Sequence, residues 1–145
     1  MKLLTNNKKV AHEYFILDTF ECGIVLKGTE IKSIRQGKFS IKESHCKVKD
    51  YEMFIINMNV TKYEYGNIFN HDEKREKKLL MSKREIIKLG QKVKLEGLTI
   101  VPTKVYLKEG LCKVEIALCK GKKLYDKRET QKDKDIKKRL RKITH

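Results

Sequence analysis

The 145-residue chain carries 35 Lys and Arg against 19 Asp and Glu, a formal net charge of +16, and 39% of its residues are hydrophobic. This length suits one domain with a hydrophobic core, and the lack of an 18-residue apolar run excludes a membrane-spanning helix. So large a positive charge favours a polyanionic partner, most often a nucleic acid, although a lysine-rich surface without any partner would have the same composition.

The amino-terminal residues and the cysteines indicate a cytoplasmic protein. The first nine residues turn polar after Leu4 and lack the hydrophobic region of a signal peptide. The four cysteines show no C-x-x-C spacing, and their spacing relative to the histidines does not support a zinc site. We therefore expect no metal and no other cofactor. The residues considered for such a site are Cys22, Cys46, Cys112, Cys119, His12, His45 and His71.

The first third of the chain predicts a loose arm, a hairpin and a helix. Residues 1–9 are polar and basic, as in a solvated terminus. The apolar runs 14–17 and 23–26 are separated by five residues, which predicts a β-hairpin. Within residues 28–37 the period changes, because Ile31 and Ile34 are three apart and Gly37 offers a helix end.

The middle of the chain predicts a second hairpin, a loop and a second helix. Residues 46–48 and 53–56 flank a polar turn and form the hairpin. Residues 57–78 have little periodicity and predict a long mobile loop. Ser82 and Glu85 match a capping box and begin a helix, although Gly90 weakens its second half.

Residues 98–107 and 111–119 give the clearest strand signals, with 108–110 as a three-residue hairpin loop. Pro102 lies inside the first run, so that strand lies at an edge or contains a bulge. Alternation places Cys112 on the core face of the second strand. The chain thus predicts a mainly β protein, in which at least five antiparallel strands form a small barrel or an α+β sheet.

The last 21 residues differ in composition from the rest. Residues 125–145 contain nine Lys or Arg and four Asp or Glu, which leaves a charge of +5, and too few apolar residues to fold alone. Ile136, Leu140 and Ile143 nevertheless have helical spacing. We expect a tail that is disordered when free and becomes an amphipathic helix when its charge is neutralised.

Catalytic motifs and phosphate-binding glycine loops do not occur, whereas features suited to RNA do. Residues 120–128 place five cations around Gly121 and Tyr125, which could contact phosphates and stack on a base, or could form a basic linker. Lys32 and Arg35 share one helical face and are either phosphate contacts or solubilising charges. Glu21 could accept hydrogen bonds from RNA or pair with a nearby Lys.

Four segments in register resemble the SsrA-binding protein family, also called small protein B. They are residues 20–33 (FECGIVLKGTEIKS), 75–81 (REKKLLM), 97–102 (GLTIVP) and 113–129 (KVEIALCKGKKLYDKRE). The resemblance implies an OB-type antiparallel β-barrel with two to three accessory helices over residues 1–124, followed by the tail at 125–145. It also implies a monomer without enzymatic activity.

The same resemblance implies partners and site residues. The first partner is transfer-messenger RNA, which is bound at its tRNA-like part. The second is the small-subunit RNA of stalled ribosomes, where the tail occupies the empty messenger channel. Elongation factor Tu is an indirect partner. The expected RNA-binding residues, including the cations considered above, are Asn7, Lys8, Glu21, Lys32, Arg35, Leu80, Lys120, Gly121, Lys122 and Lys123. The residues expected at the decoding centre and in the tail are Tyr125, Asp126, Lys127, Arg128, Ile136 and Leu140, of which the last two match only in character.

Two other functions stay open at this point. A nonspecific single-strand binder on a similar barrel would display several stacking aromatic side chains on one sheet face. A hydrolase would need His12, Glu21 and Glu30 to meet in one site.

Overall fold

The structure is a computed structural model that describes residues 1–66 and 70–122. Within these ranges the helices are α1 (Val10–Glu13), α2 (Gly28–Arg35) and α3 (Lys83–Glu96). The strands are β1 (Lys2–Asn6), β2 (Tyr14–Ile24), β3 (Phe39–Ser40), β4 (His45–Lys49), β5 (Glu52–Ile56), β6 (Asn59–Val60), β7 (Lys77–Leu80), β8 (Thr99–Lys108) and β9 (Leu111–Gly121). No helix in these ranges is long and apolar enough to cross a membrane.

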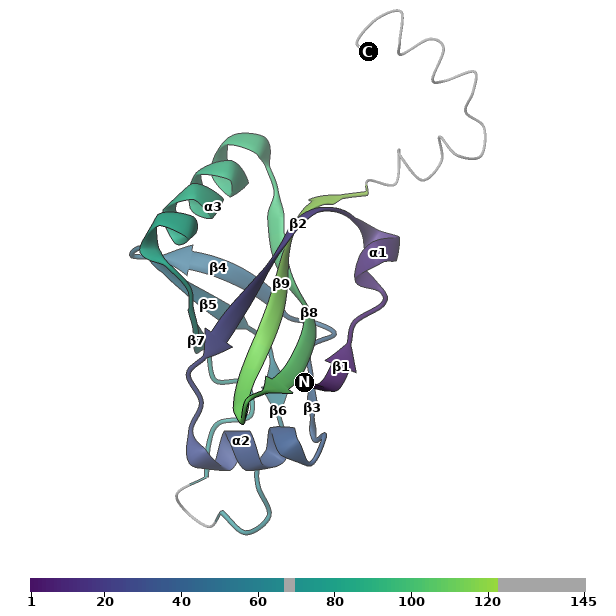
Figure 1. The fold of residues 1–145 in the computed structure, drawn as a ribbon, viewed down its shortest axis with the longest axis vertical. Coiled ribbons are helices and arrows are strands. Elements are labelled where there is room, and N and C mark those ends of the chain that lie inside the picture. The colour runs from purple at the N-terminus through teal and green to yellow at the C-terminus, as the bar shows by residue number, and fades with distance from the viewer. Residues whose placement is uncertain (67–69, 123–145) are drawn as a thin grey trace, which may run out of the picture.

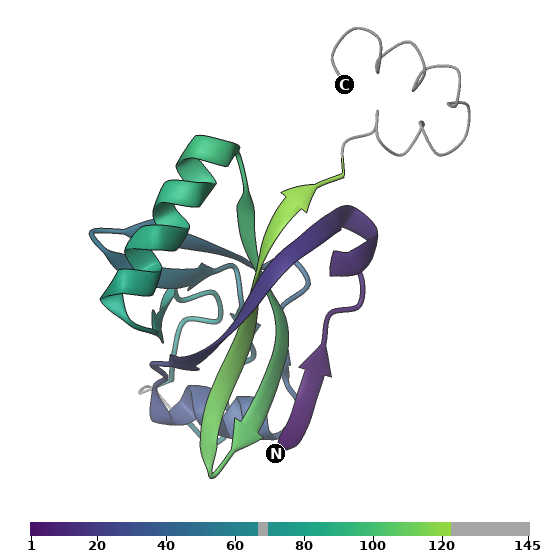
Figure 2. The ribbon, with the colours of Figure 1, turned by 45° about the horizontal axis from the view of Figure 1, so that its top comes forward.

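Six antiparallel strands close into a ring in the order β2-β7-β5-β4-β8-β9, with β9 returning to β2. Strand β1 pairs with the second half of β8, whose first half pairs with β4, and β3 pairs with β6 in a separate two-stranded sheet. Helix α2 covers one end of the ring and α3 lies along its β4–β5 flank (Figures 1 and 2). This arrangement confirms the predicted mainly β antiparallel barrel with accessory helices.

The hydrophobic core lies inside the ring and consists of the side chains on the inward face of each strand. Cys112 on β9 is buried there, as the alternation predicts, together with Val114 and Ile116, which are fully buried. A smaller cluster lies beneath α1, where Cys119 packs with Val10 from the helix. Burial raises the pKa of the Cys119 thiol to about 11, so it stays protonated at neutral pH.

Two predictions for the amino-terminal region are wrong. Residues 2–6 form β1 and pair with β8, whereas the sequence predicts a loose arm. The predicted hairpin over 14–26 is one continuous strand, β2, which pairs with β9 from Tyr14 to Gly23 through a bulge near Leu17. Both errors have one cause, since these segments find partners about a hundred residues away and local patterns carry no sign of them.

Both longer helices follow their local signals. The Ser82 hydroxyl accepts a hydrogen bond from the Glu85 backbone N–H at 3.2 Å, which confirms the predicted start of α3. The helix continues through Gly90 and ends at Gly97, which adopts a left-handed conformation with φ of 65°. Helix α2 ends before Gly37 as predicted.

The two hairpin turns differ in how well their residues suit them. Between β8 and β9 the turn consists of Glu109 and Gly110, both at positive φ, which makes it a two-residue loop and corrects the predicted three-residue one. Between β4 and β5 the turn consists of Asp50 and Tyr51, with φ of 49° and 62°. A bulky side chain is disfavoured in this backbone region, so Tyr51 holds a strained conformation.

The segment 57–78 is more ordered than a mobile loop, except that residues 67–69 lie outside the described part. It contains β6 and begins β7, and it buries His71. The His71 ring lies 2.8 Å from the Thr29 hydroxyl at Nδ1 and 2.9 Å from the Val60 carbonyl oxygen at Nε2. Because a carbonyl only accepts, Nε2 carries the proton and His71 links the segment to α2.

Candidate nucleic-acid interface

The carboxylate of Glu21 is held in place on the outside of the barrel. Glu21 lies on β2 and accepts a hydrogen bond from the Tyr106 hydroxyl on β8 at 2.5 Å, and the Lys108 ammonium lies 3.5 Å away. The hydrogen bond from Tyr106 and the charge of Lys108 lower the pKa of Glu21 below its ordinary value. An oriented, ionised carboxylate can accept hydrogen bonds from ribose hydroxyls or base amino groups.

Leu80 lies on the same outer surface. Its partner across the β2–β7 pairing is Gly23, two residues beyond Glu21, so Glu21 and Leu80 are diagonal neighbours on one face. The Leu80 side chain is 52% exposed, and a Cβ added to Gly23 would lie 3.3 Å from it. An exposed leucine beside an oriented carboxylate gives a surface with apolar and acceptor character, which we name the Glu21 face: Glu21, Leu80, Tyr106 and Lys108.

A second predicted group gathers around α1 at the other end of β2. Lys122 ties the end of β9 to this helix, because its backbone N–H donates to the Glu13 carbonyl at 2.9 Å and its ammonium to the Ala11 carbonyl at 3.0 Å. The same ammonium lies 4.8 Å from the centre of the Phe15 ring. We name this region the α1 end; its predicted RNA-binding members are Asn7, Lys8, Lys120, Gly121 and Lys122.

The amino-terminal members of the α1 end are fixed by the strand that the sequence missed. Asn7 follows β1, and its backbone N–H donates to the Thr103 carbonyl at 2.7 Å. Lys8 and Lys120 are exposed to solvent. Tyr14 and Glu21 are separated by seven residues of β2, or roughly 23 Å of strand. The α1 end and the Glu21 face are therefore two separate candidate contact regions, at opposite parts of β2.

The two α2 cations belong to neither region. Lys32 and Arg35 are exposed, but the Lys32 ammonium lies 5.4 Å from the Tyr63 ring centre, whereas Arg35 donates to the Gly110 carbonyl at 3.5 Å. Helix α2 lies at the end of the barrel away from α1 (Figure 1). The two cations, which the sequence places on one helical face, therefore contact different parts of the protein: Lys32 lies beside Tyr63, and Arg35 binds Gly110.

A buried ion network fixes α2 to the barrel. Both carboxylate oxygens of Glu30 accept hydrogen bonds from Arg75, at 2.7 and 3.0 Å. Burial acts to raise the pKa of Glu30, but the hydrogen bonds from Arg75 and the Lys27 backbone lower it. The Lys77 ammonium is fully buried, donates to the Arg75 and Met58 carbonyls and lies 3.8 Å from Glu30. The charges of Glu30 and Lys77 are internal, and the partly exposed Arg75 is paired with Glu30.

Comparison with known proteins settles the family. The family model described as SmpB protein matches residues 4–145. The chain belongs to the SmpB protein family. It is 51% identical to the SsrA-binding protein of Thermoanaerobacter pseudethanolicus over 142 residues, 98% of this chain and 91% of the relative. The SsrA-binding protein of Desulforudis audaxviator is 53% identical over 128 residues, 88% and 84% of the two chains.

A solved structure agrees with this result. It is described as "tmRNA-SmpB: a journey to the center of the bacterial ribosome", and one of its chains is 38% identical with a TM-score of 0.71. The match covers 92% of this chain and 97% of that one. The resemblance drawn from four sequence segments is thereby confirmed, as is the barrel that it implied.

Several predicted residues of this SmpB-family chain lie outside the described part. They are Lys123, Tyr125, Asp126, Lys127, Arg128, Ile136 and Leu140. Among those described, the structure brings Glu21 and Leu80 together, and it places Asn7 and Lys122 next to α1. Sequence reasoning missed Tyr106, which orients Glu21. The alternation of Lys104, Tyr106 and Lys108 along β8 was the available signal.

The structure does not assemble a catalytic or metal site from the residues considered. Glu30 is occupied by Arg75, and His12 lies on α1, at the opposite end of the barrel from α2 (Figure 1). Over residues 1–66 and 70–122, no group of three His, Cys, Asp or Glu side chains lies close enough to hold a metal ion. The hydrolase hypothesis therefore loses its site.

Proposed function

We propose that this chain binds the tRNA-like part of transfer-messenger RNA and delivers that RNA to stalled ribosomes for trans-translation. Residues 1–124 form the RNA-binding body, and residues 125–145 form a tail that occupies the empty messenger channel. The protein acts as a cytoplasmic monomer without catalysis, and elongation factor Tu joins it through the shared RNA.

The Glu21 face carries this proposal. The chain belongs to a family whose relatives are named SsrA-binding proteins, and the two residues that the resemblance assigns to RNA, Glu21 and Leu80, are diagonal neighbours on it. Hydrogen bonds from Tyr106 and Lys108 fix the orientation of the Glu21 carboxylate. Binding to phosphates alone needs only cations and does not distinguish one polyanion from another. A fixed hydrogen-bond acceptor beside an apolar side chain is suited instead to the bases and riboses of one folded RNA.

The nonspecific single-strand binder is less well supported. Such a protein needs aromatic side chains in a row on one surface. In the described ranges the large exposed aromatics are Phe15 on β2, Tyr51 in the β4–β5 turn and Tyr65 in the loop after β6. They lie on separate elements, so they form no continuous stacking platform.

Fluorescence anisotropy with the full-length protein tests the proposal. The probe is the transcribed tRNA-like part of transfer-messenger RNA from Thermoanaerobacter pseudethanolicus, with single-stranded RNA of equal length as competitor. We expect strong preference for the folded probe. Affinity should fall about a thousandfold between 50 and 200 mM salt if roughly six phosphates are contacted. Equal affinity for both RNAs would contradict the proposal.

A further inference from the structure

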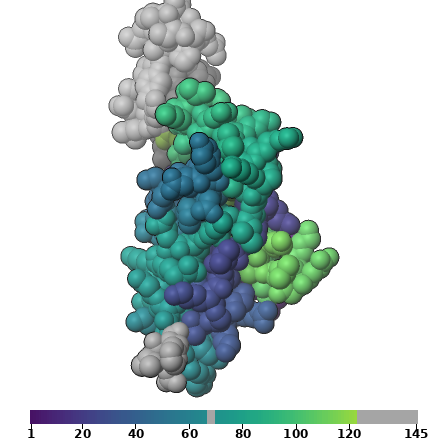
Figure 3. Space-filling model, turned by 90° about the vertical axis from the view of Figure 1, so that its left-hand side faces the viewer, coloured from purple at the N-terminus to yellow at the C-terminus, as the bar shows by residue number. Residues whose placement is uncertain are grey.

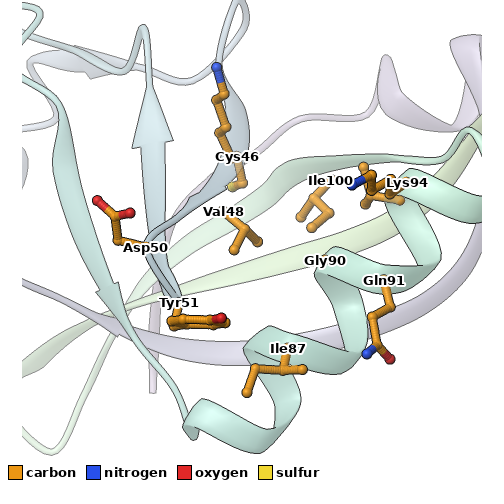
Figure 4. Close-up of a pocket in the computed structure, with 11 residues that line it drawn as sticks. Cys46, Val48, Asp50, Tyr51, Ile87, Gly90, Gln91, Lys94 and Ile100 are labelled. Carbon is orange, nitrogen blue, oxygen red and sulfur yellow. The ribbon is translucent and has the colours of Figure 1, made fainter.

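A hollow of about 660 Å³ lies outside both contact regions, between the β4–β5 hairpin and α3. Figure 3 shows the face on which this hairpin, in blue, lies beside α3, in green. The floor consists of apolar side chains from the hairpin, from α3 and from β8, which contribute Val48, Ile87 and Ile100 respectively (Figure 4). Gly90 faces Val48 across this hollow, and a Cβ added to Gly90 would make ordinary contact with a Val48 methyl at 3.6 Å.

Tyr51 stands at the mouth of this hollow in a conformation that does not suit a tyrosine. Its side chain is 64% exposed, and its φ of 62° is one that glycine adopts far more easily. A turn that served only to join β4 and β5 would favour a small residue at this position. A strained, exposed aromatic residue at the edge of a cavity points instead to a binding role.

The polar groups around the hollow suit a nucleotide. Gln91 and Lys94 on α3 line it and are exposed, so an amide and an ammonium are available to a base edge and a phosphate. The Lys83 ammonium lies 5.4 Å from the centre of the Tyr51 ring. Asp50, the one acid in the lining, points away from α3 (Figure 4). Aromatic ring, apolar floor and cations are the groups that hold an unstacked base.

The hollow also connects with the Glu21 face. A second, smaller hollow of about 440 Å³ is lined by Tyr51 together with Leu80, Met81 and Lys83. Tyr51 therefore stands between the two depressions, and an RNA strand that leaves Leu80 can pass Tyr51 and reach the groove along α3. This continuity favours RNA over an unrelated partner as the occupant.

We propose that the groove between the β4–β5 turn and α3 holds one unpaired base of the bound RNA, stacked on Tyr51, with Lys94 near its phosphate. This inference rests on the proposed function, because it assigns a further subsite for the same RNA. The hairpin turn thus contributes to recognition of a flipped-out nucleotide, in addition to the contacts at the Glu21 face.

Replacing Tyr51 tests this assignment, because RNA affinity should fall without any loss of protein stability. Tyr51→Gly removes the ring and relieves the backbone, so the melting temperature should stay unchanged or rise. Its affinity for the tRNA-like transcript should fall about tenfold, since stacking on an aromatic ring contributes on that order. Tyr51→Phe should keep wild-type affinity. Tyr65→Gly, at another exposed tyrosine near α2, is the matched control and should bind normally.

A second measurement identifies the chemistry of the occupant. Adenosine monophosphate is titrated into the ¹⁵N-labelled full chain, and the amide signals of Val48, Tyr51, Ile87 and Gly90 are followed. Saturable shifts at these four amides would support the proposal. Shifts with N-acetyl-tryptophanamide but not with the nucleotide would overturn it in favour of a protein anchor.

The outcomes separate this inference from the proposed function. Wild-type affinity of Tyr51→Gly for the transcript, with wild-type preference for folded RNA intact, would overturn the base subsite alone. Loss of that preference in the wild-type protein would overturn the proposed function instead, and the subsite with it.

Discussion

Tyr106 shows how a single buried hydroxyl can set the geometry of a surface carboxylate. It is 6% exposed, and burial together with Glu21 raises its pKa, so it stays a hydrogen-bond donor throughout the ordinary pH range. Glu21 is thus already oriented in the protein alone, before the RNA contact that we propose for it. Preorganisation of this kind reduces the entropy lost when the contact forms.

Removing the Tyr106 hydroxyl should leave the Glu21 carboxylate charged but no longer held in one orientation. In Tyr106→Phe the pKa of Glu21 should rise toward its ordinary value, because the main cause of its lowering is gone, while Glu21 remains ionised at neutral pH. RNA affinity should fall about two- to tenfold, the factor that corresponds to ordering one free side chain. Carbon-13 NMR titration of the carboxyl group and anisotropy measure the two effects. Tyr65→Phe serves as control, and an unchanged Glu21 pKa would contradict the assignment.

Glu30 should matter for stability far more than any surface acid. Glu30→Gln leaves Arg75 and the buried Lys77 without their anion, which should cost about 3–5 kcal/mol of unfolding free energy. Because the folded pKa of Glu30 lies below 4.5, its contribution is complete above that pH and is lost as the pH falls through the folded value. Urea unfolding at neutral and acidic pH, with exposed Glu43→Gln as control, should show a difference that shrinks in acid.

Helix α3 contains a residue that weakens it without an evident packing need. Gly90 lies in the helix interior, and an added Cβ would make only ordinary contact with Val48. Gly90→Ala should therefore stabilise the protein by about 0.5–1 kcal/mol through the helix backbone. A rise in the urea midpoint with an unchanged slope would confirm this expectation. Gly97→Ala, at a left-handed helix end, should instead destabilise.

At the scale of elements, local signals and long-range partners explain what the sequence could predict. The start of α3 at Ser82 and the bulge near Pro102 follow from neighbouring residues, and both are confirmed. Strands β1 and β2 depend on β8 and β9, far along the chain, so the sequence predicted an arm and a hairpin instead. The same holds for the candidate site. The sequence alone points to Glu21, whereas the role of Tyr106 depends on the fold, which brings β8 within hydrogen-bonding distance of Glu21.

Charge is divided unequally over the whole molecule. The tail at 125–145 carries +5, and residues 1–124 carry 26 basic and 15 acidic residues, or +11. Body and tail therefore repel each other, and a polyanion can bind both. The 21-residue tail carries more positive charge per residue than the 124 residues before it.

Truncation at Lys132 should reveal the separate tasks that we propose for body and tail. A chain ending at residue 131 should bind the tRNA-like transcript with affinity within about threefold of wild type, since all the residues expected to contact the phosphates and bases of that RNA precede Lys132. Release of peptides from ribosomes stalled on messages without a stop codon should be abolished. Anisotropy and a reconstituted translation assay measure these outcomes. Collapse of RNA binding would contradict the division.

The pairing of β1 with the second half of β8 has a practical consequence for labelling. The chain begins at Met1 near the β8–β9 turn and α2, whereas β9 ends beside α1 at the far end of the ring (Figures 1 and 2). A dye or purification handle fused ahead of Met1 would lie remote from the stretch that follows β9. A reporter at Met1 could then serve as one member of an energy-transfer pair in ribosome-binding experiments.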